Sequence, residues 1–393
     1  MFRHPANIVF LLICLGFLGK EFSRVHSLGS HFNHADGFSE DHSKEGAENF
    51  FKLGFAYSGG LQVWPRFDQD TNVPILKEKR IYTHYYPGPD YVIAMTFAVF
   101  GISDFTFQWT RLIPLFLIFF SIVAFILTMQ NTYFDQWPWF KSAFAPLLFW
   151  PPAMRWWSIS LHGHGYVTAI FFTLCAITWY SSYRSPSKSD SIFLFVLAFL
   201  LGIVSNYMLL TFAFVVCAAP LVSGLLIGTK DSGMNGVKLS FVVGLGLVAA
   251  FFLHLAQIAW VVDSWAVAWD SQLRIAGIRA VVERSEPITR IMLIGRYSEY
   301  CAQFWWIGSL PLVVLGLFIC SLQKVGAYSQ MRIYRVLGLL VAFLSSYAWV
   351  MALKNHSIDH PHVNPRIFIV LHMAFLVLCA QLAYERILDG RRN

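Results

Sequence analysis

Charged residues are scarce in this sequence. Only 13% of its 393 residues are Asp, Glu, Lys or Arg, about half the usual share of a soluble domain. Cysteine is also rare: the six cysteines form no CxxC pair and lie in or beside apolar runs, so buried thiols are expected rather than a disulfide framework. The chain has no low-complexity tract and no internal repeat, which excludes a solenoid architecture.

Apolar residues fill most of the remaining chain. Hydrophobic residues make up 56% of the sequence, and the aromatic share of 17% includes 14 Trp and 37 Phe. Because a membrane-spanning helix needs about 20 mostly apolar residues, this composition predicts an all-α polytopic membrane protein. The apolar runs are 6–23, 110–130, 136–154, 164–182, 190–204, 207–228, 239–262, 304–322, 333–352 and 366–385.

These runs predict about ten transmembrane helices in a single domain, residues 1–393, beginning with an uncleaved first helix. We expect no soluble C-terminal domain. A further apolar piece at 91–102 is too short to span a bilayer and predicts an interfacial helix.

Basic residues in the short loops set the expected orientation. The inner loops then carry Arg184, Lys188, Lys230, Lys238, Lys324, Arg332, Arg335, Arg386, Arg391 and Arg392. This distribution places both chain ends inside and explains the formal net charge of +7 without a nucleic-acid partner. The long outer segments are 24–109 and 263–303. In the second, apolar residues recur at helical spacing with arginines between them, which predicts an amphipathic helix on the outer surface.

An acidic, histidine-rich stretch, HFNHADGFSEDHSKEG, occupies residues 31–46 of the first outer segment. A general base must accept a proton near neutral pH within hydrogen-bond reach of its target, and Asp36, Glu40, Asp41 and Glu45 are the candidates. Neighbouring residues on a helix point about 100° apart, so we expect only one of Glu40 and Asp41 to face a site. The alternative is that these charges only solvate a loop.

Two histidine motifs fall in other outer segments. They are LHGHG, with His162 and His164, and NHSIDHPH, with His356, His360 and His362. Their spacings are compatible with metal ligation, but neither matches a fixed metal-site pattern. We expect these side chains to bind a polar substrate or to cap helices, so no cofactor is required, and a divalent metal is an open alternative.

Aromatic and basic residues of the outer segments supply further candidates for binding. His84 and Tyr85 lie in THYYPGPDY, residues 83–91, where exposed aromatic rings can stack on a sugar or sit at the lipid interface. Arg279, Lys354 and Arg366 can bind a phosphate, because cationic side chains and the planar guanidinium fork suit its oxygens. Ordinary contact with lipid headgroups is the alternative.

The order of features in residues 6–130 resembles a known family. An acidic pair lies in SEDHSKEGAENFFKLG (39–54), and YTHYYPGPDYVIAMTFAVFGISDFTFQWTRLIP (82–114) follows before the second span. This order resembles the polytopic glycosyltransferases of the GT-C superfamily, such as the protein O-mannosyltransferases and the aminoarabinose transferases of lipid A. The matching positions are Glu40-Asp41, Asn49-Phe50 to Gly54, Pro87 to Pro89, Phe100 to Ser103, and Arg111.

The resemblance implies an inverting glycosyltransferase with a GT-C-like helix arrangement. The donor would be a dolichyl- or undecaprenyl-phosphate-linked sugar, and the acceptor a hydroxyl of a glycan, lipid or protein. The base would be Asp41, Glu40 or Asp36, and the Glu-Asp order, where the family has Asp-Glu, leaves open which one. The expected substrate-binding residues are His42, His84, Tyr85, His162, His164, Arg279, Lys354, His356, His360 and Arg366. The expected location is the bacterial inner membrane, with the site facing the periplasm.

Two other functions are open from the sequence. One is a non-catalytic GT-C-like scaffold subunit of a membrane complex. The other is a transporter or a divalent-metal membrane enzyme. A transporter would need ionisable residues at mid-membrane depth, whereas most of the polar residues here fall in the outer segments.

Overall fold

The computed structural model describes residues 4–31, 37–63, 81–83, 86–162, 164–204, 209–281, 288–305, 308–323, 329–352, 354, 358 and 367–390. Helices make up nearly all of this part of the chain, which confirms the predicted all-α class. The described strands are two short ones, β1 (Gln62–Val63) and β2 (Ile81–Tyr82), which pair antiparallel.

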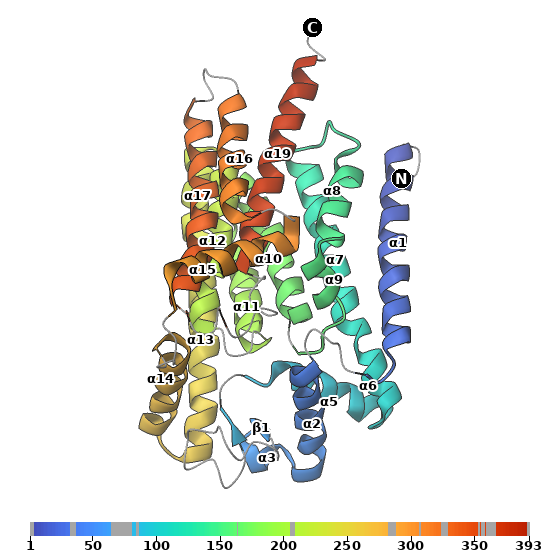
Figure 1. The fold of residues 1–393 in the computed structure, drawn as a ribbon, viewed down its shortest axis with the longest axis vertical. Coiled ribbons are helices and arrows are strands. Elements are labelled where there is room, and N and C mark those ends of the chain that lie inside the picture. Colours follow the sequence, from blue (N-terminus) through green and yellow to red (C-terminus); the bar gives the residue numbers. More distant parts are fainter. Residues whose placement is uncertain are drawn as a thin grey trace.

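The long helices run along one common direction, and both chain ends lie at the same end of the bundle (Figure 1). These helices are α1 (Pro5–Leu28), α7 (Leu112–Thr132), α10 (His164–Arg184), α11 (Lys188–Val204), α12 (Leu209–Ile227), α13 (Lys230–Val262), α16 (Ser309–Leu322), α17 (Ser329–Ala352) and α19 (Ile369–Gly390). Chain ends on one side agree with an even number of crossings.

Several helices have the properties of membrane spans. The stretches Asp104–Thr132, Lys230–Val262, Gln330–Ala352 and Ile369–Gly390 are long and apolar enough to cross a bilayer, and the bent pair Arg290–Phe304 with Ser309–Leu322 adds a fifth if it forms one span. Large apolar side chains such as Phe120 and Phe241 are more than half exposed along these helices, as expected for surfaces that face lipid. Each of the ten predicted runs contains helix in its described residues, but the number of ten spans stays a prediction.

Two segments differ from their predicted form. The run 136–154 is not one helix but two, α8 (Phe140–Phe149) and α9 (Pro152–Trp157), because the adjacent Pro151 and Pro152 lack amide hydrogens and disfavour a helical residue before them. The single amphipathic helix expected in 263–303 is likewise divided into α14 (Trp265–Val281) and α15 (Arg290–Trp305). α14 packs along α13, and α15 crosses the bundle (Figure 1).

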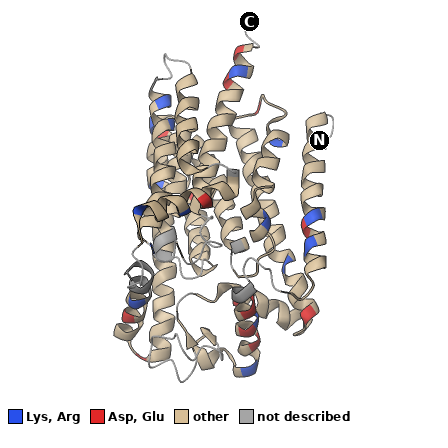
Figure 2. Ribbon diagram, viewed as in Figure 1, with Lys and Arg blue, Asp and Glu red and all other residues tan. Residues whose placement is uncertain are grey.

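A small lobe lies at the end of the bundle opposite the chain termini (Figure 1). It contains α2 (Gly37–Leu53), α3 (Phe55–Ser58), α5 (Gly88–Phe100), α6 (Asp104–Thr110) and the β1–β2 pair. The apolar piece at 91–102 falls largely within α5, and Pro89 lies in the first turn of this helix. Figure 2 shows the acidic residues of α2 grouped here, whereas the middle of the bundle carries few charges.

The sequence FGIS (100–103) forms the junction between α5 and α6. Gly101 ends α5 with a φ of 83°, a backbone conformation that glycine adopts without strain. The Ser103 side chain then caps α6 by accepting a hydrogen bond from the Thr106 amide at 3.1 Å. The resulting sharp turn brings α6 and the start of α7 against α2.

Candidate functional site

Glu40 is held at the centre of the lobe by groups from three segments. Its Oε2 atom accepts a hydrogen bond from Arg111 Nη2 at 2.7 Å, and both side chains are fully buried. Its Oε1 atom accepts a hydrogen bond from the Leu161 amide at 3.0 Å. Arg111 Nη2 also donates to the His31 carbonyl oxygen at 3.1 Å. The carboxylate therefore joins the start of α2, the α6–α7 junction and the loop before α10.

Asp41 is the member of the acidic pair that retains contact with solvent. It follows Glu40 on α2, so its side chain points about 100° further around the helix. Glu40 is fully buried, whereas Asp41 is only half-buried. Which acid of the pair faces a site stays a prediction, with Asp41 the more exposed of the two.

The histidines predicted beside the acidic pair lie in the interior of the lobe. His42 and His162 are both almost completely buried. The Ser43 Oγ and the His162 Nδ1 are 2.8 Å apart and share a hydrogen bond, and Gln62 Nε2 donates to the His42 carbonyl oxygen at 3.2 Å. The two histidines, predicted to bind substrate, therefore lie near the acids with little exposed surface.

A third acid, Asp90, joins this cluster and was missed as a site residue from the sequence. It lies in the first turn of α5 and is completely buried. A Cβ atom added to Gly46 would lie 2.8 Å from its Oδ2, so α2 and α5 approach closely here. The sequence signal was the acid directly after Pro89, since acids are favoured in the first turn of a helix.

Asp90 differs from Glu40 because no cation faces it among the described residues. Neither of its oxygens accepts a hydrogen bond of ordinary geometry from that part of the chain. Burial raises the pKa of Asp90 well above its ordinary value, and the adjacent Ser43 hydroxyl offsets only part of that increase. The cluster thus contains a buried acid paired with arginine and a buried acid whose pKa is raised.

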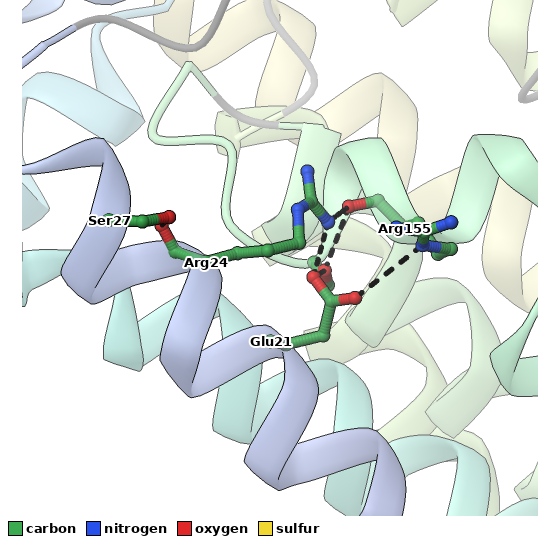
Figure 3. A network of polar contacts seen from close by, with 5 residues as sticks. Glu21, Arg24, Ser27 and Arg155 are labelled. Atoms are coloured by element: carbon green, nitrogen blue, oxygen red, sulfur yellow. Dashed lines mark hydrogen bonds and ion pairs between the residues drawn. The ribbon is translucent and has the colours of Figure 1, made fainter.

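A third buried acid, Glu21, fixes the segment that leads to His162. Figure 3 shows Glu21 of α1 between Arg24 and Arg155. The Ser158 hydroxyl donates to Glu21 Oε2 at 3.1 Å, and Arg24 Nη1 donates to the Arg155 carbonyl oxygen at 2.5 Å. Glu21 therefore holds the end of α9 against α1. Because Glu40 binds the Leu161 amide, both ends of segment 158–161 are attached to buried carboxylates.

The other predicted site residues are placed less closely. Lys354 is exposed and helical. His164 begins α10 and Arg279 belongs to α14, and the structure gives their backbones only. Asp36, His84, Tyr85, His356, His360 and Arg366 lie outside the described residues. Within the described ranges, no group of three or more His, Cys, Asp or Glu side chains could hold a metal ion.

The described residues of the lobe are therefore of the types that transfer protons and position other groups. The half-buried Asp41 carboxylate stands beside a fully buried ion pair, a hydroxyl–imidazole hydrogen bond and a buried acid whose pKa is raised. Comparisons of the chain with protein-family models, with curated proteins and with solved structures gave no match.

Proposed function

We propose that the protein is a membrane glycosyltransferase, which moves a sugar from a polyprenyl-phosphate donor to an acceptor hydroxyl with inversion. The Glu40–Arg111 pair carries this proposal. These residues are two separate parts of the pattern that resembles the GT-C superfamily, and they meet at 2.7 Å across 71 positions of sequence. A buried ion pair adds little net stability over an apolar pair of similar volume. We therefore propose that this pair positions the acidic start of α2 rather than adding stability.

Asp41 is the general base in this proposal. Its carboxylate takes the proton of the acceptor hydroxyl, whose oxygen attacks the anomeric carbon of the sugar. The bond between that carbon and the donor's phosphate oxygen breaks, and the polyprenyl phosphate leaves as an anion. Glu40 is less suited to this step because Arg111 and the Leu161 amide occupy both of its oxygens.

The leaving phosphate needs cationic groups near its oxygens. Lys354 is exposed and has the right charge, and Arg279 and Arg366 are the other proposed contacts. Arg111 is not proposed for this role because Glu40 already neutralises it. The chemistry needs no cofactor, since a polyprenyl phosphate leaves already ionised.

The proposed location is the bacterial inner membrane with the lobe in the periplasm. The lobe lies at the end away from both chain ends (Figure 1), and the basic loops of the sequence favour the chain ends inside. The acceptor would be a hydroxyl of a glycan, a lipid or a protein that reaches this face.

The test uses the full chain in lipid nanodiscs. Mass spectrometry of co-purified lipids would identify a polyprenyl-phosphate sugar, and its transfer to water or to candidate acceptors would then be measured. Asp41→Asn is expected to lower the rate by about 10²–10⁴-fold, the usual contribution of a general base, with an unchanged melting temperature. Glu48→Gln is the matched control, because Glu48 lies on the same helix and pairs with Lys52 at 3.1 Å. Full activity of Asp41→Asn would rule out the proposed base.

A scaffold subunit without catalytic activity is the second candidate. The observation that favours it is the complete engagement of Glu40, which a purely structural role explains equally well. In that case Asp41→Asn would support function in cells as well as the wild type does, while variants of Arg111 would not, because only the latter disturb the lobe.

A further inference from the structure

A cavity of about 310 Å³ lies at the end of the bundle that carries the chain termini. It is formed where the end of α16, the start of α17 and the end of α19 meet near the end of α7. Its volume is within the range of small-molecule sites, about 300–1,000 Å³. This cavity shares no residue with the Glu40 cluster and has no part in the proposed transfer reaction.

Gln323 is a buried polar side chain of this cavity with no partner in the described part of the chain. Its residue is only 5% exposed, and neither its Nε2 nor its Oε1 makes a hydrogen bond there. Buried polar atoms are nearly always hydrogen-bonded, and leaving one unsatisfied is unfavourable. An amide that lines a cavity in this state indicates that the cavity holds a polar group.

Arg335 lies deep in the same cavity and is held in one orientation. It donates from Nη1 to Glu385 Oε1 at 2.7 Å and from Nη2 to the Tyr133 hydroxyl at 2.6 Å. Its Nε–H, also buried, has no partner among the described residues. Glu385 neutralises the charge of Arg335, but the Nε–H is a further donor in the cavity.

Arg332 and Arg386 supply positive charge that carboxylates neutralise less than they neutralise the charge of Arg335. Arg332 donates from Nε to the Cys320 carbonyl oxygen at 2.7 Å and from Nη2 to the Ser321 carbonyl oxygen, so it offsets the negative end of α16. Arg386 is exposed at the rim. With Arg335 the lining has three arginines against two acids, Glu385 and Asp389, which leaves one net positive charge.

Leu322, Met331, Leu382 and Leu388 form the apolar part of the lining, and Tyr133 and Tyr384 complete it. We propose that this cavity binds a phosphate group attached to an apolar body, with Gln323, Arg332 and Arg386 around the phosphate. Arginine suits phosphate because its planar fork donates to two oxygens at once, and the Gln323 amide can donate a further bond. The source is either an anionic phospholipid headgroup or a soluble organic phosphate.

The experiment compares retained lipids on the full chain by native mass spectrometry. The protein is prepared in micelles with equal amounts of phosphatidylglycerol and phosphatidylcholine, and glycerol 3-phosphate is then added as a competitor. We expect phosphatidylglycerol to be retained preferentially. Arg386→Glu and Gln323→Leu should each weaken its retention by about tenfold or more, since each removes a hydrogen-bond donor to a charged group. Loss of retained lipid on adding glycerol 3-phosphate would indicate a soluble ligand, and its persistence would indicate a headgroup.

The matched control is Lys188→Glu, which makes the same charge change at the start of α11, on an exposed residue outside the cavity. It should leave retention unchanged. Equal retention of the two lipids, or equal weakening by Lys188→Glu and Arg386→Glu, would overturn the proposal, because either result indicates non-specific surface charge. Arg386 is exposed, so its variant remains testable even if the buried Gln323→Leu does not fold.

Discussion

The two ends of the molecule each contain an arginine–glutamate pair with the same separation but a different environment. Arg111 and Glu40 are 2.7 Å apart in the lobe, with both side chains fully buried. Arg335 and Glu385 are also 2.7 Å apart at the opposite end, but the Glu385 side chain is 34% exposed. Distance therefore does not distinguish the pairs. The free-energy cost of removing the arginine does distinguish them, because water can then hydrate the Glu385 carboxylate but not the buried Glu40 carboxylate.

The largest effect is expected from Arg111→Met. The change keeps most of the side-chain volume but leaves Glu40 charged and buried without its counter-ion, which should cost about 3–5 kcal/mol. Denaturant unfolding of the full chain in detergent would measure the loss. The double variant Glu40→Met with Arg111→Met should recover most of it, since apolar replacement of a buried pair is often nearly neutral. A single variant as stable as the wild type would show that water reaches Glu40.

Asp90 extends the comparison to a buried acid that has no arginine. Its folded-state pKa is raised by burial, so its neutral form favours folding below the unfolded pKa, about 3.9. This advantage is lost as pH rises toward the folded pKa, by up to about 1.4 kcal/mol per pH unit. Asp90→Asn, which cannot ionise, should therefore gain stability relative to the wild type as pH rises. Melting temperatures from pH 5 to pH 8 would measure this, and parallel curves would contradict it.

Arg335→Met is the matched change for the second pair and should have a smaller effect. Glu385 can turn to solvent, so we expect a loss near that of a partly exposed pair, about 1 kcal/mol, in the same unfolding assay. The Tyr133 hydroxyl also loses the donor that lies 2.6 Å away. A loss equal to that of Arg111→Met would show that the exposure of Glu385 does not govern the difference.

The helices and the Glu40–Arg111 contact differ in how far the sequence predicts them. The predicted apolar runs contain helices in their described residues, because length and hydropathy determine such segments locally, but the number of ten spans stays a prediction. The break in 136–154 could have been expected from Pro151 and Pro152, but the run was treated by hydropathy alone. The Glu40–Arg111 contact could not be derived from spacing, since it joins positions 71 apart. Glu40 was a candidate because of its acidic neighbours, whereas Arg111 was noticed only through a resemblance to a family.

Asp90 was missed for a related reason. Sequence position places it in the first turn of a helix, where an acid is ordinary. Its unusual state arises from the close approach of α2 at Gly46, which is a tertiary contact with no signature in the local sequence. Asp41, in contrast, was a candidate from the sequence. The structure adds that its side chain is more exposed than that of Glu40.

The smallest effect is expected at a third pair with the same separation, Lys44 and Asp104, which are 2.7 Å apart with the Asp104 side chain 68% exposed. The hydrogen bond from Lys44 lowers the pKa of Asp104, so any stabilisation exists above the unfolded pKa of about 3.9 and is lost as pH falls through the folded pKa. Near neutral pH, Asp104→Asn should scarcely change the melting temperature, because water and salt already screen the exposed pair. The Arg111→Met and Arg335→Met variants should have lower melting temperatures than Asp104→Asn at every salt concentration. If Asp104→Asn instead destabilised the protein as much as Arg335→Met, burial would not explain why three ion pairs of equal length contribute differently to stability.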